Sequence, residues 1–260
     1  MNERAPHPLG AVRSLARVLA RTVASSLGAA RGARAPGEVW RQMFEVGNRS
    51  LVFVAVTLGF IGMVLVFQTC LQVGRVTGDL SQVGAEYVKI LVHEFGPSIT
   101  AMMLATRVGA GIAAEIGSMS VTEQVDALRM NGVDPVDYLI VPRFIACLVM
   151  GAVMTAFAIA VALGMGTLTA YASFQVNPNV FLDFSRVTGG DVVVGAAKCL
   201  AYGAALPVVS GWCGLEARGG SEGVGWATTR AVVGSSLAVI LLDFALSGAG
   251  YLLFQTEPGL

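Results

Sequence analysis

Long stretches without a charged side chain are the feature that most constrains the fold of this chain. Residues 51–71 contain no Asp, Glu, Lys or Arg over 21 positions, and residues 144–182 contain none over 39. About 20 apolar residues in an α-helix cross the ~30 Å hydrocarbon core of a bilayer. The first stretch therefore predicts one transmembrane helix, and the second predicts a long helix followed by an outer loop.

Three further segments are apolar but contain ionisable residues. Residues 192–215 are interrupted only by Lys198, and residues 231–254 only by Asp243. Residues 90–116 are uncharged between Phe95 and Thr106, but contain four ionisable side chains: His93, Glu94, Arg107 and Glu115. Only 13% of the chain is charged, against about 25% in soluble domains. We therefore expect an all-α polytopic membrane protein with about five transmembrane helices.

The basic residues predict the orientation of these helices, because Arg and Lys near span ends are retained on the cytoplasmic side. Residues 1–50 contain eight Arg. If this segment is cytoplasmic, the cytoplasmic segments together contain twelve Arg. The segments on the other side of the membrane then contain only three basic residues. The sequence thus predicts a cytoplasmic N-terminus and an outer C-terminus.

Residues 1–45 form a segment of different character from the single transmembrane domain expected over 46–260. Apolar and basic side chains fall on separate helical faces: Val12, Leu15, Leu19 and Val23 on one, Arg13, Arg17 and Arg21 on the other. This pattern is typical of an amphipathic helix on anionic lipid. The arginines break the apolar stretch that a signal peptide requires, so no signal peptide is predicted. An organellar transit peptide has the same pattern and stays an alternative.

A short charged helix is predicted between the second and third spans. The residues Ser120-Val-Thr-Glu123 fit a capping box, so we expect the helix to begin near Val121 and to end at Asn131-Gly132. At about eleven residues, or ~16 Å, it is too short to cross a bilayer. Two edges are predicted: an apolar one of Val121, Val125 and Leu128, and a charged one of Glu123, Asp126 and Arg129. On the predicted topology a soluble ATPase or regulator can reach it; a solvated loop helix without a partner is the alternative.

Several motifs of catalysis and cofactor binding are missing from the sequence. The four cysteines show no C-x-x-C spacing, there are two histidines, and no G-x-x-x-x-G-K-[ST] phosphate loop occurs. The glycine-rich stretch 219–225 is interpreted as a flexible inner turn. We therefore expect no catalytic residue, metal or cofactor in this chain, and any ATP must be bound by another subunit.

Ionisable residues inside the spans are candidates for a functional site. Placing one in a bilayer costs at least about 2.5–3.5 kcal/mol, so such residues normally face a cavity, form pairs or serve transport. His93, Glu94, Lys198 and Asp243 are the candidates, and Pro97 near Glu94 is expected to open backbone groups beside a cavity. A structural ion pair between Lys198 and Asp243 is the alternative, and a pair lining a lipid cavity satisfies both interpretations.

Six sequence blocks together resemble the MlaE/YrbE family of permeases. They occur in the family's order and spacing between about residues 40 and 250: HEFGP at 93–97, RVGAGIAAEIGSM at 107–119, TEQVDAL at 122–128, GVDP at 132–135, PR at 142–143 and ATTRAVVGSSLAVILLDF at 227–244. One departure is that many members have Arg where this chain has His93. That departure puts a fixed phosphate contact at this position in doubt.

The resemblance implies a permease subunit of an ABC-type transporter in a bacterial inner membrane. It implies a homodimer, a cytoplasmic ATPase that binds ATP and Mg, a periplasmic MCE-domain protein, and phospholipid or a related lipid as cargo. Some members also bind a small cytoplasmic STAS-domain protein, and no nucleic acid is expected. Residues 118–130 match the coupling helix that docks on the ATPase, with Ser118, Glu123, Gln124, Asp126 and Arg129 as its contacts. Glu94, Lys198 and Asp243, beside His93, match the lipid path.

Arg107 and Glu115, near the inner end of the second span, are expected to snorkel toward water or to hold the short helix in place. Three rival functions stay open. A secondary transporter needs ion-coupling carboxylates and often an internal repeat, whereas here Asp243 stands alone and no repeat is visible. An intramembrane enzyme needs a nucleophile with a base or a metal set, which the sequence does not provide. A membrane anchor for periplasmic proteins is the third.

Overall fold

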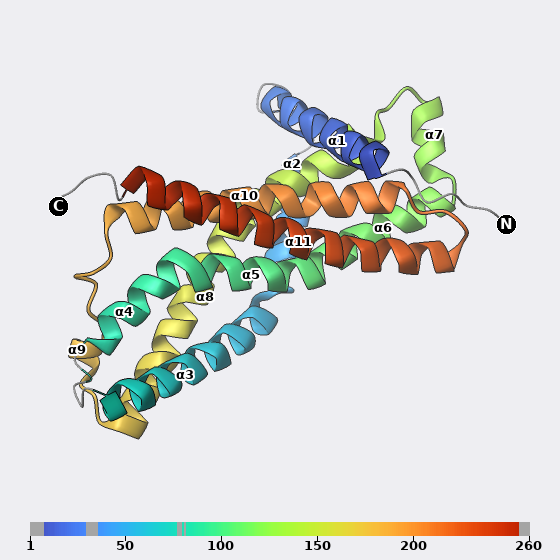
Figure 1. The fold of residues 1–260 in the computed structure, drawn as a ribbon. Coiled ribbons are helices and arrows are strands. Elements are labelled where there is room, and N and C mark those ends of the chain that lie inside the picture. Colours follow the sequence, from blue (N-terminus) through green and yellow to red (C-terminus); the bar gives the residue numbers. More distant parts are fainter. Residues whose placement is uncertain (1–7, 30–35, 77–79, 81, 255–260) are drawn as a thin grey trace. The chain divides into compact units, whose positions relative to one another are not determined.

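The computed structural model describes residues 8–29, 36–76, 80 and 82–254, and every element in these ranges is helical (Figure 1). Within them, five helical segments are long and apolar enough to cross a membrane: Gly37–Val76, Val83–Val121, Val136–Phe174, Gly189–Leu215 and Ser221–Leu253. The predicted all-α polytopic fold and its five spans are therefore confirmed.

The spans are built from the following elements. The first contains α2 (Pro36–Gly47) and α3 (Leu51–Val76), and the second contains α4 (Val83–Ile90), η1 (Leu91–Phe95), α5 (Gly96–Leu104), η2 (Ala105–Gly109) and α6 (Ala110–Val121). The third contains η3 (Val136–Ile140) and α8 (Val141–Phe174), and the last two are α10 (Gly189–Leu215) and α11 (Ser221–Phe254). Three short or peripheral helices complete the fold: α1 (Pro8–Ala29), α7 (Gln124–Met130) and α9 (Pro178–Phe181).

The last span begins earlier than the expected residue 231. Gly219 and Gly220 have φ angles of 86° and 80°, which reverse the chain in a turn of few residues. A side chain at Gly223 would collide with the carbonyl of Arg218, so glycine permits the tight start of α11. Most of the expected flexible turn at 219–225 is therefore the first turn of a helix.

The chain forms two compact units. The first contains Met1–Val46, Ala105–Val149 and Gly203–Ala238, and the second contains Gly47–Leu104, Met150–Tyr202 and Val239–Leu260. All five spans contribute one part to each unit. The predicted division at residue 45 stays a prediction, and the chain before it is grouped with the first unit.

Helix α1 belongs to the first unit and is attached to it by several contacts. Leu15 packs against a buried cluster that includes Val209 and Cys213, and the indole N–H of Trp212 donates to the Ser14 hydroxyl at 3.0 Å. The Arg21 guanidinium pairs with the Asp134 carboxylate at 2.9 Å. The predicted helix is thus confirmed. Its position on a lipid surface stays a prediction, and the Val12 side chain lies outside the described residues.

Close approach of α3 and α8 holds the second unit together. A Cβ atom at Gly62 would lie 2.8 Å from the Ala162 carbonyl oxygen and 2.9 Å from the Tyr87 hydroxyl. That hydroxyl donates to the same carbonyl at 2.9 Å. The small residue at position 62 therefore permits both the helix crossing and the buried hydrogen bond.

We expect Gly62→Leu to destabilise the protein by about 1–3 kcal/mol, because the added side chain must separate α3 from α8. Gly164→Leu on α8 is the matched control, since a Cβ atom there meets nothing within 4 Å. Thermal unfolding of both variants in detergent measures the difference. Equal unfolding temperatures for the two variants would contradict the assigned crossing.

Candidate functional site: a buried ionic cluster

A π-helical turn places the first two predicted site residues. Pro97 has no N–H to donate to the carbonyl of His93, and the ring of a proline inside a helix clashes with that carbonyl. The helix accommodates the proline by forming the π-helical turn η1. In this turn the Gly96 N–H donates to the Leu91 carbonyl, five residues earlier. His93 and Glu94 both lie in this turn. Such turns frequently occur at functional sites.

The predicted charges of three spans meet in the second unit. The Lys198 ammonium on α10 pairs with the Glu94 carboxylate on η1, and its Nζ lies 2.9 Å from Oδ1 of Asp243 on α11. The predicted pairing of Lys198 with Asp243 is present, and Glu94 joins it. We call these three residues, with His93, the ionic cluster.

Hydroxyl groups that the sequence analysis missed complete the cluster. Asp243 Oδ1 accepts hydrogen bonds from the Ser98 hydroxyl at 2.9 Å and the Tyr202 hydroxyl at 2.6 Å. Glu94 Oε1 accepts from the Ser247 hydroxyl at 2.8 Å. A sequence signal for them existed, because each lies four positions after a charged member of the cluster, on the same side of its helix.

The carboxylates of the cluster are accessible and its lysine is not. The Lys198 side chain is fully buried, whereas those of Glu94, Asp243 and His93 are 36%, 30% and 25% exposed. His93 Nδ1 lies 3.2 Å from Glu94 Oε1. The cluster therefore presents an acidic edge to any molecule in the apolar surroundings, with the positive charge behind it.

The short helix between spans differs from its prediction at its start. Helix α6 continues to Val121, and α7 begins only at Gln124, after Glu123 in the left-handed region with φ 61°. The Ser120 hydroxyl donates to the carbonyls of Leu215 and Ala217. The predicted capping box is therefore wrong, because Ser120 is engaged with the end of α10. The predicted stop is confirmed by Gly132 at φ 74°.

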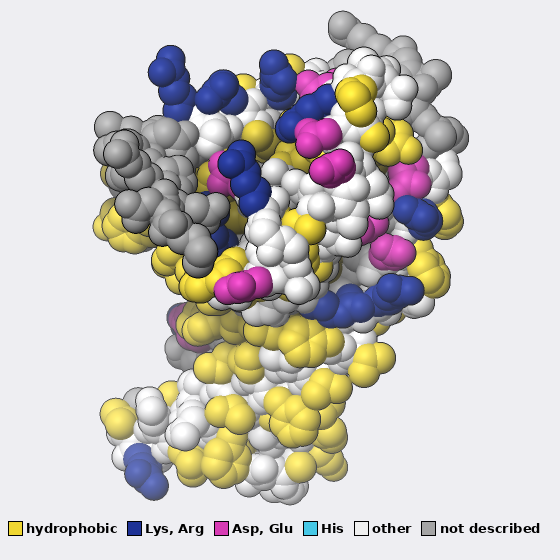
Figure 2. Space-filling view, turned by 90° about the vertical axis from the view of Figure 1, so that its right-hand side faces the viewer, with side chains coloured by type: hydrophobic (Ala, Val, Ile, Leu, Met, Phe, Trp, Pro, Cys, Tyr) yellow, Lys and Arg dark blue, Asp and Glu magenta, His cyan; other side chains and the backbone are white. Residues whose placement is uncertain are grey.

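The faces of α7 agree with their predicted character. Val125 is buried and Leu128 is half-buried, whereas the charged edge is exposed. Asp126 and Arg129 form an ion pair with an O–N distance of 2.8 Å. The other predicted contact residues, Ser118 in α6, Glu123 and Gln124, are also exposed. Figure 2 shows side chains of both charges gathered on the face of the molecule that carries α7.

A second buried charge lies in the first unit. The Arg143 side chain is only 6% exposed, and its Nη2 pairs with Glu115 Oε2 at 2.8 Å. Its Nη1 donates to the Leu139 carbonyl. Arg143 and Glu115 both line a cavity of about 540 Å³. Arg107 lies in the π-helical turn η2 and is half-buried. Glu115 thus anchors Arg143 at the start of α8, a partner that the sequence analysis did not identify.

Removing the two members of this pair is expected to have unequal effects. Glu115→Gln leaves the buried Arg143 charge without its carboxylate and should destabilise the protein by about 3 kcal/mol. Arg143→Met leaves a Glu115 side chain that is 48% exposed and can be hydrated, so a loss of only about 1 kcal/mol is expected. Thermal unfolding of both variants shows which of them loses more stability. A larger loss for Arg143→Met would show that the arginine is not the costly member.

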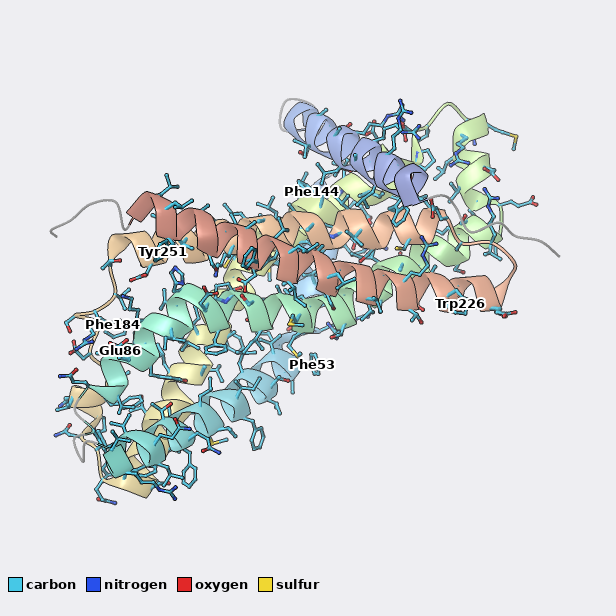
Figure 3. The ribbon with its side chains drawn as sticks, in the orientation of Figure 1. Phe53, Glu86, Phe144, Phe184, Trp226 and Tyr251 are labelled. Atoms are coloured by element: carbon cyan, nitrogen blue, oxygen red, sulfur yellow. The ribbon has the colours of Figure 1, made fainter. Side chains whose placement is uncertain are left out.

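Aromatic side chains mark both ends of the last span. Trp226 and Tyr251 lie near the two ends of α11 and are 65% and 62% exposed (Figure 3). Aromatic residues concentrate at the two surfaces of a bilayer. Together with five spans and charges buried among them, this defines a polytopic membrane protein with a polar site inside its helices, a combination typical of transport proteins.

Comparison with known proteins identifies the family. The permease family MlaE matches residues 39–249. A probable ABC transporter permease of Synechocystis is 38% identical over 218 residues, covering 82% of this chain and 81% of the relative. One of Rickettsia felis is 34% identical, covering 80% of each chain. The chain belongs to the MlaE permease family.

A plant relative differs in length. The chloroplastic protein trigalactosyldiacylglycerol 1 of Arabidopsis thaliana is 34% identical over 214 residues. The match covers 80% of this chain but 61% of the relative. The family resemblance seen in the sequence blocks is thus confirmed.

Proposed function

We propose that this chain is the permease subunit of an ABC-type transporter that moves phospholipid or a related lipid between the inner membrane and the outer envelope. Membership of the MlaE permease family and the two relatives named as ABC transporter permeases support the transporter class. The plant relative carries the name of a galactolipid, which supports a lipid cargo. ATP hydrolysis takes place in a separate ATPase subunit.

The ionic cluster is the observation that carries the lipid path in this proposal. An ion pair with only a structural role is best shielded on all sides, yet the side chains of Glu94 and Asp243 stay partly exposed inside apolar spans. A phospholipid headgroup brings charge and hydrogen-bonding groups to the acidic edge, while its chains suit the apolar side chains beside it. Exposed Phe95 and Phe244 adjoin the two carboxylates in the sequence.

Helix α7 is proposed as the coupling helix. Its Val125 holds it to the first unit, while Glu123, Asp126 and Arg129 are exposed for charge-specific contact with the ATPase. This assignment places α7 and the N-terminus in the cytoplasm, in agreement with the excess of Arg in residues 1–50. We further propose that Arg107 and Glu115 hold the helices next to α7 in place, Glu115 through its ion pair with Arg143.

Further partners belong to the same proposal. Large apolar side chains are exposed along α3 and α11, among them Phe60, Leu237 and Leu241. Contiguous apolar faces of this kind suit lipid and a second copy of the chain. We propose a homodimer that joins two ATPase subunits and a periplasmic MCE-domain protein, with a STAS-domain protein as an additional cytoplasmic partner.

Affinity purification of the tagged chain from its native membrane, followed by mass spectrometry of proteins and lipids, tests the proposal. Recovery of an ATPase, an MCE-domain protein and phospholipid is expected. Recovery of the chain alone, monomeric and free of lipid, would contradict it and would favour an ATP-independent secondary transporter. Recovery of periplasmic proteins without ATPase or lipid would favour a membrane anchor.

A further inference from the structure

We infer that the ionic cluster is a site for one positive charge, which is supplied either by a proton on His93 or by the ammonium group of a zwitterionic lipid. The inference rests on the proposed function and names the headgroup class that the lipid path selects. It predicts that headgroup selectivity depends on pH through His93.

The charge balance of the cluster is the first step. Two carboxylates, Glu94 and Asp243, share one ammonium, that of Lys198. With a neutral imidazole at His93 the cluster carries a net charge of −1, and with a protonated imidazole it is neutral. An uncompensated charge among apolar spans is costly, so the cluster favours one additional cation.

The second step concerns which group can supply that cation. The charged and titratable groups that face the acidic edge come from three elements: His93 and Glu94 on η1, Lys198 and Tyr202 on α10, and Asp243 on α11. The lysine already contacts both carboxylates. Ser98, Tyr202 and Ser247 donate hydrogen bonds but bring no charge. Within this set the imidazole of His93 is the group that can add a positive charge by taking up a proton.

The third step is geometric. His93 Nδ1 lies 3.2 Å from Glu94 Oε1, whereas the Lys198 ammonium pairs with Oε2 of the same carboxylate. A protonated imidazole and an external ammonium therefore compete for the same carboxylate charge. By linkage, a proton on His93 weakens ammonium binding, and a bound ammonium weakens proton binding. A lipid whose headgroup is only anionic has no group for this position.

Competition between two lipids in the purified full-length protein tests the inference. The protein is equilibrated in mixed micelles with equal amounts of phosphatidylethanolamine and phosphatidylglycerol at pH 5.5 and pH 8.0, and the retained lipids are quantified. In the unmodified protein we expect the ratio of phosphatidylethanolamine to phosphatidylglycerol to rise about tenfold from the lower to the higher pH, within the usual range of coupling between sites.

Two variants separate His93 from other titrating groups. His93→Gln is expected to give the high ratio at both pH values, and His93→Arg the low ratio at both. A ratio that does not change with pH in the unmodified protein would overturn the inference. So would a pH dependence that persists in His93→Gln, because the titrating group would then be a carboxylate.

The total amount of retained lipid distinguishes this inference from the proposed function. If the unmodified protein and both variants retain lipid with no headgroup preference, the charge site is wrong and the lipid path stands. If none of them retains lipid at either pH, the lipid path and the charge site both fail.

Discussion

Lys198→Met is expected to destabilise the protein by about 3–5 kcal/mol, because it leaves two carboxylates among apolar spans without their cation. Lys198 is fully buried and contacts both Glu94 and Asp243, so no other described residue of the cluster carries a permanent positive charge that can replace it. Denaturation of the purified protein in detergent measures the loss. Lipid transfer by the assembled transporter should decrease together with this loss of stability.

A triple variant is the matched control for this effect. Glu94→Gln and Asp243→Asn, added to Lys198→Met, remove all three charges at nearly constant volume, and replacing a whole buried pair is often neutral for stability. We expect the triple variant to fold about as stably as the unmodified protein but to lose headgroup selectivity. If it were as unstable as Lys198→Met alone, packing around Lys198 and not its charge would be responsible.

Exchange of Asp126 and Arg129 on α7 is expected to weaken binding of the ATPase subunit about 100-fold. Juxtaposed like charges at an interface cost several kcal/mol, and Asp126→Arg with Arg129→Asp reverses the charge pattern of the exposed edge. Binding of the detergent-purified chain to the ATPase, measured by titration calorimetry, gives the affinity. ATP turnover stimulated by lipid should be lost at the same time.

The exchange is designed to leave the fold unchanged. Both residues are exposed, and the exchanged pair can form the same contact between positions 126 and 129. Glu123→Gly removes one charge of the same exposed edge, and glycine accepts the left-handed conformation at this position without strain. That variant should weaken binding by less than the exchange does, because it loses one contact and introduces no like-charge pair. Unchanged binding by the exchanged variant would exclude α7 as the docking element.

The spans were predictable because the bilayer imposes length and composition on each of them separately. The charge-free residues 51–71 and 144–182 each lead to a helix regardless of what surrounds it. Helix boundaries were less predictable. The start of α11 depends on two left-handed glycines at 219 and 220, which look like a flexible loop in the sequence alone.

The sequence does not predict which side chains from distant parts of the chain contact one another. Ser120 fits a capping box by spacing, yet the carbonyls of Leu215 and Ala217 lie close enough to accept its hydroxyl. In the sequence Arg143 is an orientation signal and part of the PR block at 142–143, and neither pattern indicates that it is buried against Glu115. Both partners were missed because contacts between residues far apart in the chain have no local pattern.

The ionic cluster was predictable in part: its members could be selected from the sequence, but their contacts could not. The cost of a charge in an apolar span was enough to select Glu94, Lys198 and Asp243 individually. That all three converge, with Ser98, Tyr202 and Ser247 as donors, follows from the register of η1, α10 and α11. The π-helical turn before Pro97 sets part of that register, and no composition rule predicts it.

The measurement that tests the central claim most directly is lipid transfer by the chain reconstituted with its co-purified partners in proteoliposomes. Transfer of a fluorescent phospholipid to an acceptor is followed with ATP, without ATP, and with the exchanged Asp126 and Arg129 variant. The proposed function predicts transfer that requires ATP and is lost in the variant. Transfer at the same rate without ATP would contradict an ATP-driven permease, and no transfer under any condition would contradict a lipid cargo.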